Sequence, residues 1–244
     1  MERYRNRYSH KNSVPNELFL LKKAFKPGQA AETRLEDGPE GRRAWVSKSL
    51  RAFMGRVGRF RRPSVLDLGR VNGGNIFFLG SQGCRVCVND FLRERSELLM
   101  PAGAGAAGEP DLGDSADDAW RKILAGLEYA PASLRGVICW DSLERIPPAW
   151  AKQLLKRLHG MLDAGGVILS FFGSAKPGEA GSHKGFRILD HDHVEPIPAA
   201  SEHPGRHGYK NAEIMDVFAG YKVLDFCLLK GGYREILVQK GGEA

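Results

Sequence analysis

The segment Ser64-Val-Leu-Asp-Leu-Gly-Arg-Val-Asn-Gly-Gly-Asn-Ile-Phe-Phe-Leu79 has the pattern of a ligand-binding turn between a strand and a helix. Its first, apolar half predicts a short buried strand, and Gly69, Gly73 and Gly74 predict a turn that leads into a helix. Backbone N–H groups at a helix N-terminus bind anionic or polar ligands, and glycine lets a ligand approach because no Cβ intervenes. We therefore expect a small-molecule site at this turn.

The composition is that of a globular protein. The chain has 244 residues, of which 42% are hydrophobic and 27% charged, which is enough for one large α/β domain with its own core. No apolar run approaches the roughly 20 residues of a membrane helix, and no signal-peptide pattern follows Met1. We expect a soluble, cytoplasmic protein that does not contact membranes.

Positive charge is concentrated near the N-terminus. The net charge is +7, and residues 1–62 hold 16 Lys and Arg against 6 Asp and Glu. We predict that residues 1–62 form a basic arm and helical extension, followed by a domain of residues 63–244. Apolar residues recur at helical spacing over residues 42–60, with arginines between them, which predicts an amphipathic helix that covers the sheet. Its basic outer face is either a solvated surface or a contact with an anionic partner such as RNA.

The four cysteines do not form a disulfide framework in a chain of this length. Cys84 and Cys87 have the spacing of a redox or zinc pair. On a strand, however, residues three apart point to opposite faces, so we interpret both as buried structural residues.

A second short strand, residues 84–90, ends in Asp90, which lies 23 positions after Asp67. A Rossmann-type site places the carboxylate that binds ribose hydroxyls at about this distance, roughly 20 residues. The succession of strand, turn, helix, strand and terminal acid is more specific than a glycine-rich turn alone.

Strands and helices continue to alternate along the chain. We predict a helix over residues 115–127, a strand over 134–140, a helix from Pro148 to about residue 162, and a strand over 167–172. This alternation predicts a parallel sheet with right-handed crossovers. No third strand is evident in the Ala- and Gly-rich residues 101–113.

The order of these motifs resembles the class I S-adenosylmethionine-dependent methyltransferases. The resemblance rests on Val65–Gly69, on Asp90, on Gly136–Arg145, and on Leu162-Asp-Ala-Gly-Gly-Val-Ile-Leu169. It also rests on a helix near residues 211–219 and two strands, 221–229 and 233–240, around a Gly-Gly turn. A terminal antiparallel hairpin of this kind distinguishes the family from dehydrogenases.

The resemblance covers about residues 60–240 and implies the fold of the family. This is a Rossmann-like α/β sandwich with a mostly parallel sheet, a C-terminal antiparallel hairpin and helices on both faces. It also implies S-adenosyl-L-methionine as cofactor and methyl transfer to an acceptor that the sequence does not identify.

Cofactor-binding roles follow position by position from the resemblance. Asp67 and Gly69 match the motif beneath the methionine part of the cofactor, Asp90 matches the ribose-binding acid, and Asp141 lines the pocket near the sulfonium. The complete implied set of cofactor-binding residues is Asp67, Gly69, Arg70, Gly73, Asn75, Asp90, Phe91, Asp141 and Ser142.

One departure from the family pattern keeps other functions open. The usual glycine two residues after Gly69 is replaced by Val71, which follows Arg70. A degenerate methyltransferase fold that serves as a binding or scaffold protein is the alternative that this departure favours. A dinucleotide-dependent oxidoreductase is disfavoured by the terminal hairpin and by the absence of Gly-x-Gly-x-x-Gly spacing.

Residues 173–210 are the expected location of groups that orient or deprotonate the acceptor. They contain five histidines, and Asp190-His-Asp-His193 suggests metal ligands. No recognised metal signature fits, so we predict no metal site. The remaining interpretations are a base or substrate-pocket role for one histidine, or a plain surface loop.

Overall fold

The structure is a computed structural model and describes residues 44–94, 113–173, 183–198, 207–229 and 232–241. The predicted arm of residues 1–62 and the Ala- and Gly-rich residues 101–113 lie largely outside these ranges. Residues Arg43–Ala244 form one compact unit. None of the helices in the described part of this unit is long and apolar enough to cross a membrane.

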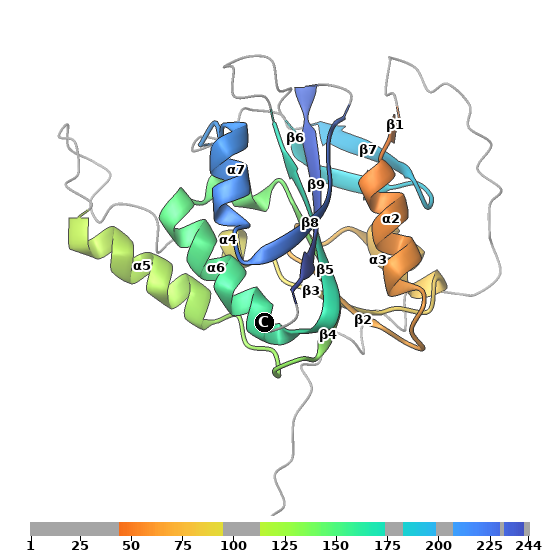
Figure 1. Cartoon of the computed structure of the whole chain (residues 1–244), viewed down its shortest axis with the longest axis horizontal. Coiled ribbons are helices and arrows are strands. Elements are labelled where there is room, and N and C mark those ends of the chain that lie inside the picture. The colour runs from red at the N-terminus through yellow and green to blue at the C-terminus, as the bar shows by residue number, and fades with distance from the viewer. Residues whose placement is uncertain (1–43, 95–112, 174–182, 199–206, 230–231, 242–244) are drawn as a thin grey trace, which may run out of the picture. The chain divides into compact units, whose positions relative to one another are not determined.

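A six-stranded sheet in the order β3-β2-β4-β5-β9-β8 forms the centre of this unit (Figure 1). Its first four strands in that order are parallel, whereas β9 runs antiparallel to both β5 and β8. The strands are β2 (Ser64–Asp67), β3 (Arg85–Val88), β4 (Leu134–Trp140), β5 (Leu162–Phe172), β8 (Tyr221–Leu228) and β9 (Arg234–Lys240). This arrangement confirms the predicted mostly parallel sheet with a C-terminal antiparallel hairpin.

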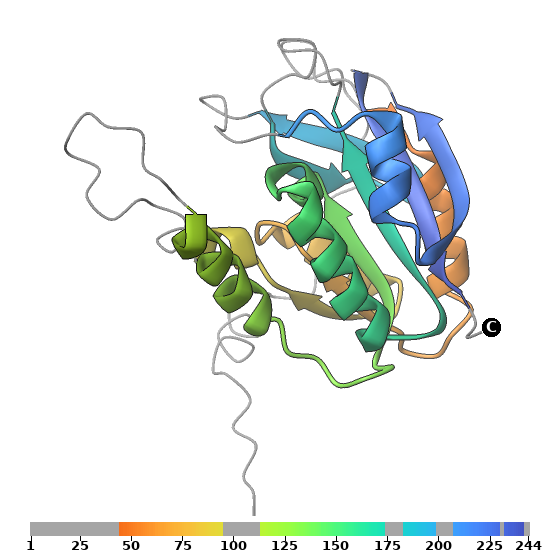
Figure 2. The same cartoon turned by 60° about the vertical axis from the view of Figure 1, so that its left-hand side comes forward.

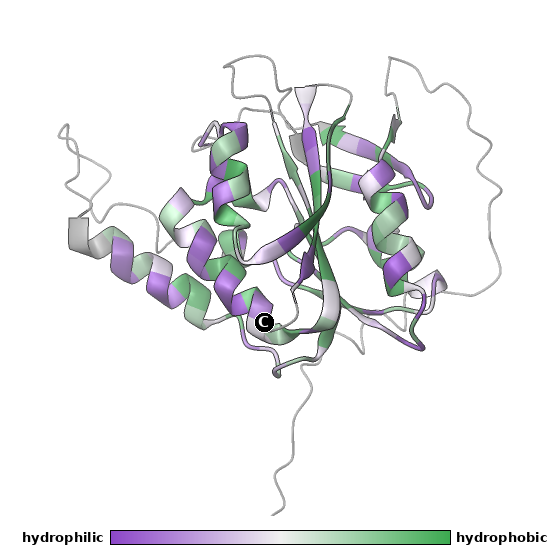
Figure 3. Ribbon diagram, in the orientation of Figure 1, coloured by the Kyte–Doolittle hydropathy of each residue, from purple (hydrophilic) through white to green (hydrophobic). Residues whose placement is uncertain are grey.

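Helices cover both faces of the sheet, as Figure 2 shows from a second side. One face carries α4 (Phe91–Glu94), α5 (Gly113–Ala125), α6 (Pro148–Met161) and α7 (Asn211–Val217), and the other carries α2 (Lys48–Val57) and α3 (Gly73–Ser81). A short 3-10 helix, η2 (Ser142–Arg145), follows β4. The helices show both green and purple stretches in Figure 3, as expected of elements with one buried side.

Two hydrophobic cores lie on opposite sides of the sheet because side chains alternate along each strand. On β4, Val137 and Cys139 belong to the core under α6, whereas Ile138 and Trp140 belong to the core under α2. Cys84 and Cys87 pack against different cores, but both are half-buried and not fully buried as predicted.

Helix α2 packs against β5 and β9 through its buried apolar side, as predicted. It is shorter than the predicted span of residues 42–60, because Trp45–Val46 form a strand instead. Its N-cap, Ser47, accepts a 3.0 Å hydrogen bond from the backbone N–H of Leu50. Glu235 of β9 is 1% exposed and accepts hydrogen bonds from the Ser47 hydroxyl and the Ser49 N–H. A buried carboxylate at a helix N-terminus is favourable, so Glu235 fixes α2 onto the sheet.

A second, three-stranded antiparallel sheet in the order β1-β7-β6 lies beside α2 and α3 (Figure 1). It consists of β1 (Trp45–Val46), β6 (His183–Ile188) and β7 (His193–Pro198). The interpretation of residues 183–198 as a plain surface loop is therefore wrong. The buried residues of this second sheet, Phe186, Ile188 and Val194, alternate with more exposed ones. Such an alternation in the sequence indicates strands.

Candidate functional site

A cavity of about 340 Å³ lies at the carboxyl ends of the parallel strands. This volume falls in the range of small-molecule sites, roughly 300–1,000 Å³. The walls come from the turn after β2, the end of β3, the β4–η2 junction and the β6–β7 hairpin. The lining residues are Gly69, Arg70, Val71, Asn72, Asp90, Arg93, Trp140, Asp141, Ser142, Arg145, Gly185, Phe186 and Ile197.

The glycine-rich turn contributes backbone and short side chains to one wall. Asn72 ends the turn as the N-cap of α3, and its side-chain oxygen accepts hydrogen bonds from Gly74 N (2.9 Å) and Asn75 N (3.4 Å). Helix α3, which has nine residues, therefore begins at the cavity wall. Arg70 and Val71 are exposed and line the cavity without filling it.

Gly69 and Trp140 are in close contact at the base of the cavity. A Cβ on Gly69 would lie 2.6 Å from Trp140 Cδ1 and 3.0 Å from Asp67 Oδ1, so only glycine fits. Trp140 has a φ of 48°, in the left-handed region that tryptophan rarely adopts. Backbone strain of this kind is concentrated at functional sites.

Asp67 lies behind the cavity wall rather than in it. Its carboxyl group is 1% exposed and accepts a 2.7 Å hydrogen bond from Trp140 Nε1. Burial raises the pKa of Asp67 to about 6, although the hydrogen bonds from Trp140, Asn75 and the Gly69 N–H partly oppose this rise. Asp67 thus fixes the indole that forms the base of the cavity.

Asp90 lines the cavity at the end of β3. Its Oδ2 atom is buried and has no hydrogen-bond partner among the residues that the structure describes. An unpaired buried carboxylate oxygen is costly, by roughly 1–3 kcal/mol or more. This atom can therefore accept a hydrogen bond from a bound molecule.

Asp141 and Ser142 lie at the end of β4, where the chain turns into η2. Ser142 Oγ donates a 2.6 Å hydrogen bond to the backbone oxygen of Leu68, which ties η2 to the end of β2. Both side chains reach the cavity and are largely buried. Asp141 thus adds a second carboxylate to the lining.

The β6–β7 hairpin closes the cavity on the remaining side through Gly185, Phe186 and Ile197. Asn75 of α3 holds this hairpin: its Nδ2 donates to Phe186 O (3.0 Å), and its Oδ1 accepts from Ile188 N (2.8 Å). Phe186 stacks on Trp140 with ring centroids 5.8 Å apart. The hairpin and β4 therefore share an aromatic surface at the cavity.

The structure brings five of the nine predicted site residues to the cavity: Gly69, Arg70, Asp90, Asp141 and Ser142. The other four lie outside its lining: Asp67 and Asn75 are buried and hydrogen-bonded, Phe91 is in the core, and Gly73 is the first residue of α3. Sequence reasoning missed Phe186 and Ile197, because they belong to strands that it did not assign.

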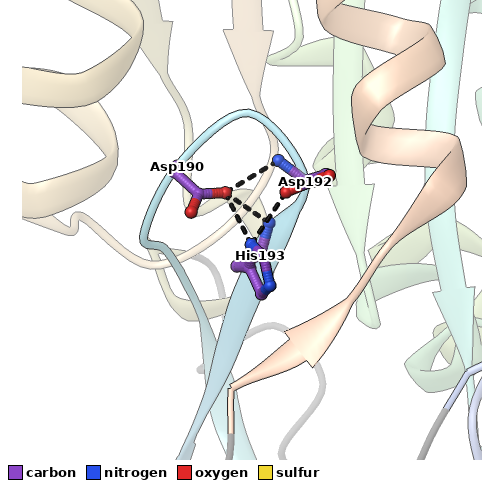
Figure 4. Close-up of side chains that lie close together, drawn as sticks. All are labelled: Asp190, Asp192 and His193. Atoms are coloured by element: carbon purple, nitrogen blue, oxygen red, sulfur yellow. Dashed lines mark hydrogen bonds and ion pairs between the residues drawn. The ribbon is translucent and has the colours of Figure 1, made fainter. Parts of the chain in front are cut away.

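Asp190, Asp192 and His193 of the Asp190–His193 segment lie together at the tip of this hairpin (Figure 4). Asp190 Oδ1 accepts hydrogen bonds from the backbone N–H groups of Asp192 (2.9 Å) and His193 (2.8 Å), and from His193 Nδ1. Asp192 forms ion pairs with Arg51 of α2 and with His193. These contacts explain the cluster as a hydrogen-bonded turn. No histidine of the described ranges lines the cavity.

Comparison with solved structures finds several methyltransferases at low sequence identity. A Mesorhizobium loti S-adenosylmethionine-dependent methyltransferase is 14% identical with a TM-score of 0.47, and the match covers 78% of this chain and 95% of that chain. The 1,6-didemethyltoxoflavin-N1-methyltransferase of Burkholderia thailandensis is 16% identical with a TM-score of 0.44, covering 80% of each chain. The magnesium protoporphyrin IX methyltransferase of Synechocystis is 15% identical with a TM-score of 0.42, covering 79% and 77%. No family model and no curated protein matches the sequence.

The antiparallel pair β8 and β9 is the C-terminal hairpin that the resemblance predicted, and β9 lies between β5 and β8. The sheet therefore has the mostly parallel, open α/β arrangement that the resemblance implies. In this fold the carboxyl ends of the parallel strands converge on one crevice, and the cavity of this chain lies there.

Proposed function

We propose that this protein transfers a methyl group from S-adenosylmethionine to a small acceptor. The observation that carries the proposal is the cavity between the Gly69–Asn72 turn and the strand-end carboxylates of Asp90 and Asp141. A cavity at this edge of the sheet is where open α/β folds bind nucleotides.

Two features of the cavity suit an adenosyl cofactor. The unpaired, buried Oδ2 of Asp90 offers an acceptor for a ribose hydroxyl. The missing Cβ at Gly69 lets the Trp140 indole form the base of the cavity near the α3 N-terminus.

The methyl group of the cofactor is already activated as a sulfonium, so the protein mainly has to bind and orient the reactants. Asp90 would hold the ribose, and Asp141 lies where it can accept hydrogen bonds from the cofactor ammonium. Phe186 and Trp140 exclude water from the base of the cavity and present an apolar surface to the acceptor.

Calorimetric titration of the full chain with S-adenosylmethionine, S-adenosylhomocysteine and NAD tests the proposal. We expect the first two ligands to bind and NAD to give no heat of binding. Binding of NAD alone would support an oxidoreductase instead. If none of the three ligands binds, the result would support a protein that serves as a binding or scaffold protein.

If the titration shows binding, cell extracts incubated with the protein and cofactor carrying a labelled methyl group should show label transfer to an acceptor. Binding without transfer to any extract component would contradict the enzymatic part of the proposal.

A further inference from the structure

Three arginines from three different elements line the cavity: Arg70 of the turn after β2, Arg93 of α4 and Arg145 of η2. Two carboxylates, Asp90 and Asp141, face them. The lining therefore carries one more positive than negative charge. The proposed cofactor has a sulfonium, an ammonium and a carboxylate, so it adds a further net positive charge.

The side chains of Arg70 and Arg145 form no hydrogen bond or ion pair with any residue in the described ranges. Arg70 is exposed, whereas Arg145 is half-buried between the end of β4 and the hairpin. A guanidinium that loses water in a filled cavity needs an anionic partner, because an unpaired charge is costly there. The carboxylate of the cofactor can satisfy only one of these groups.

The positions of the two arginines separate their roles. Arg70 belongs to the glycine-rich turn after β2, on the side of the proposed ribose site at Asp90. Arg145 comes three residues after Ser142, on the side of β4, and shares the cavity with Phe186 and Ile197 of the hairpin. The hairpin side is left for the acceptor.

We propose that the methyl acceptor carries an anionic oxygen group, a carboxylate or a phosphate, that Arg145 binds. A guanidinium matches the two oxygens of either group through parallel N–H···O bonds. The aromatic surface of Trp140 and Phe186 beside Arg145 suits the apolar part of the same molecule. This inference rests on the proposed function and specifies its substrate class.

The test uses the full chain saturated with S-adenosylhomocysteine, so that the cofactor carboxylate already occupies its own site. Inorganic phosphate and acetate are titrated separately as probes of the two anion types. We expect the complex to bind at least one of them, and the preferred anion identifies the acceptor group. Arg145→Gln should weaken this binding at least 10-fold, and Arg145→Lys should weaken it less.

Arg59→Gln is the matched control, because it removes the same charge from an exposed residue outside the cavity lining. It should bind the anion as the unchanged protein does. Absence of anion binding, or equal binding by Arg145→Gln, would overturn the inference while cofactor binding stands. Failure to bind S-adenosylhomocysteine is a separate result that overturns the proposed function itself.

Discussion

The indole Nε1 of Trp140 donates a 2.7 Å hydrogen bond to the buried carboxylate of Asp67. These residues end neighbouring parallel strands, β4 and β2. The bond holds the indole over Gly69, where it forms the base of the cavity. Asp67 therefore shapes the cavity through its hydrogen bond to Trp140.

Removing this bond should destabilise the fold. Trp140→Phe keeps an aromatic ring but leaves a buried Asp67 oxygen without its donor, which costs roughly 1–3 kcal/mol. Urea denaturation measures the loss. Trp150→Phe is the control, because Trp150 donates to Asp117, an exposed residue. Equal losses in the two variants would contradict the role assigned to the Trp140–Asp67 pair.

Asp67 should make stability depend on pH. Burial raises its pKa from 3.8 to about 6, so the folded protein holds a proton that the unfolded chain releases. The stabilisation is complete below about pH 4 and is lost as the pH rises through 6. A rise of about 2 in this pKa corresponds to roughly 3 kcal/mol in the free energy of unfolding. Denaturation from pH 4 to 7 measures the free energy of unfolding of the unchanged protein and of Asp67→Asn. The difference between the two should change by this amount over the pH range. A constant difference would show that Asp67 has its ordinary pKa.

Gly69→Ala and Gly73→Ala should behave differently. A Cβ at Gly69 would lie 2.6 Å from Trp140 Cδ1, whereas a Cβ at Gly73 would meet nothing within 4 Å. We expect Gly69→Ala to lower the melting temperature and weaken S-adenosylhomocysteine binding, because Trp140 must move. Gly73→Ala should preserve the melting temperature, since alanine favours a helix. A Gly69→Ala variant as stable as the unchanged protein would contradict the tight contact.

Glu235 should be essential for the docking of α2. Glu235→Gln places an amide among donors, the Ser47 hydroxyl and the Ser49 N–H, and should cost roughly 2 kcal/mol. Glu213→Gln is the control: Glu213 accepts from Lys210 N at an exposed helix start, where a cap contributes about 1 kcal/mol or less. Denaturation curves distinguish the two. A smaller loss for Glu235→Gln than for Glu213→Gln would refute the docking role.

The sequence predicted the central sheet well because its signals are local. Leu134–Trp140 is a continuous apolar run, and the observed strand has these bounds. Pro148 marks the first turn of α6, and the alternation of strands and helices gave the parallel order. These features depend on residues close together in the chain.

The second sheet was missed because β1 and β7 pair across about 150 residues, at Trp45 and Val194. The role of Asp67 was missed for a related reason. Its hydrogen-bond partner, Trp140, is 73 positions away, and no local pattern indicates that an indole will cover Gly69. Arg145 reaches the cavity only because η2 follows β4 at the sheet edge.

The most direct test of the proposed cofactor site is the affinity of Asp90 variants for S-adenosylhomocysteine, measured by calorimetry. Asp90→Ala should weaken binding by about 1–3 kcal/mol, or roughly 5- to 150-fold, because the ribose hydroxyls lose their acceptor. Asp216→Asn, a change at an exposed carboxylate that pairs with Lys152, should bind normally. Unchanged affinity of Asp90→Ala would contradict a ribose at Asp90 and, with it, the placement of the cofactor in this cavity.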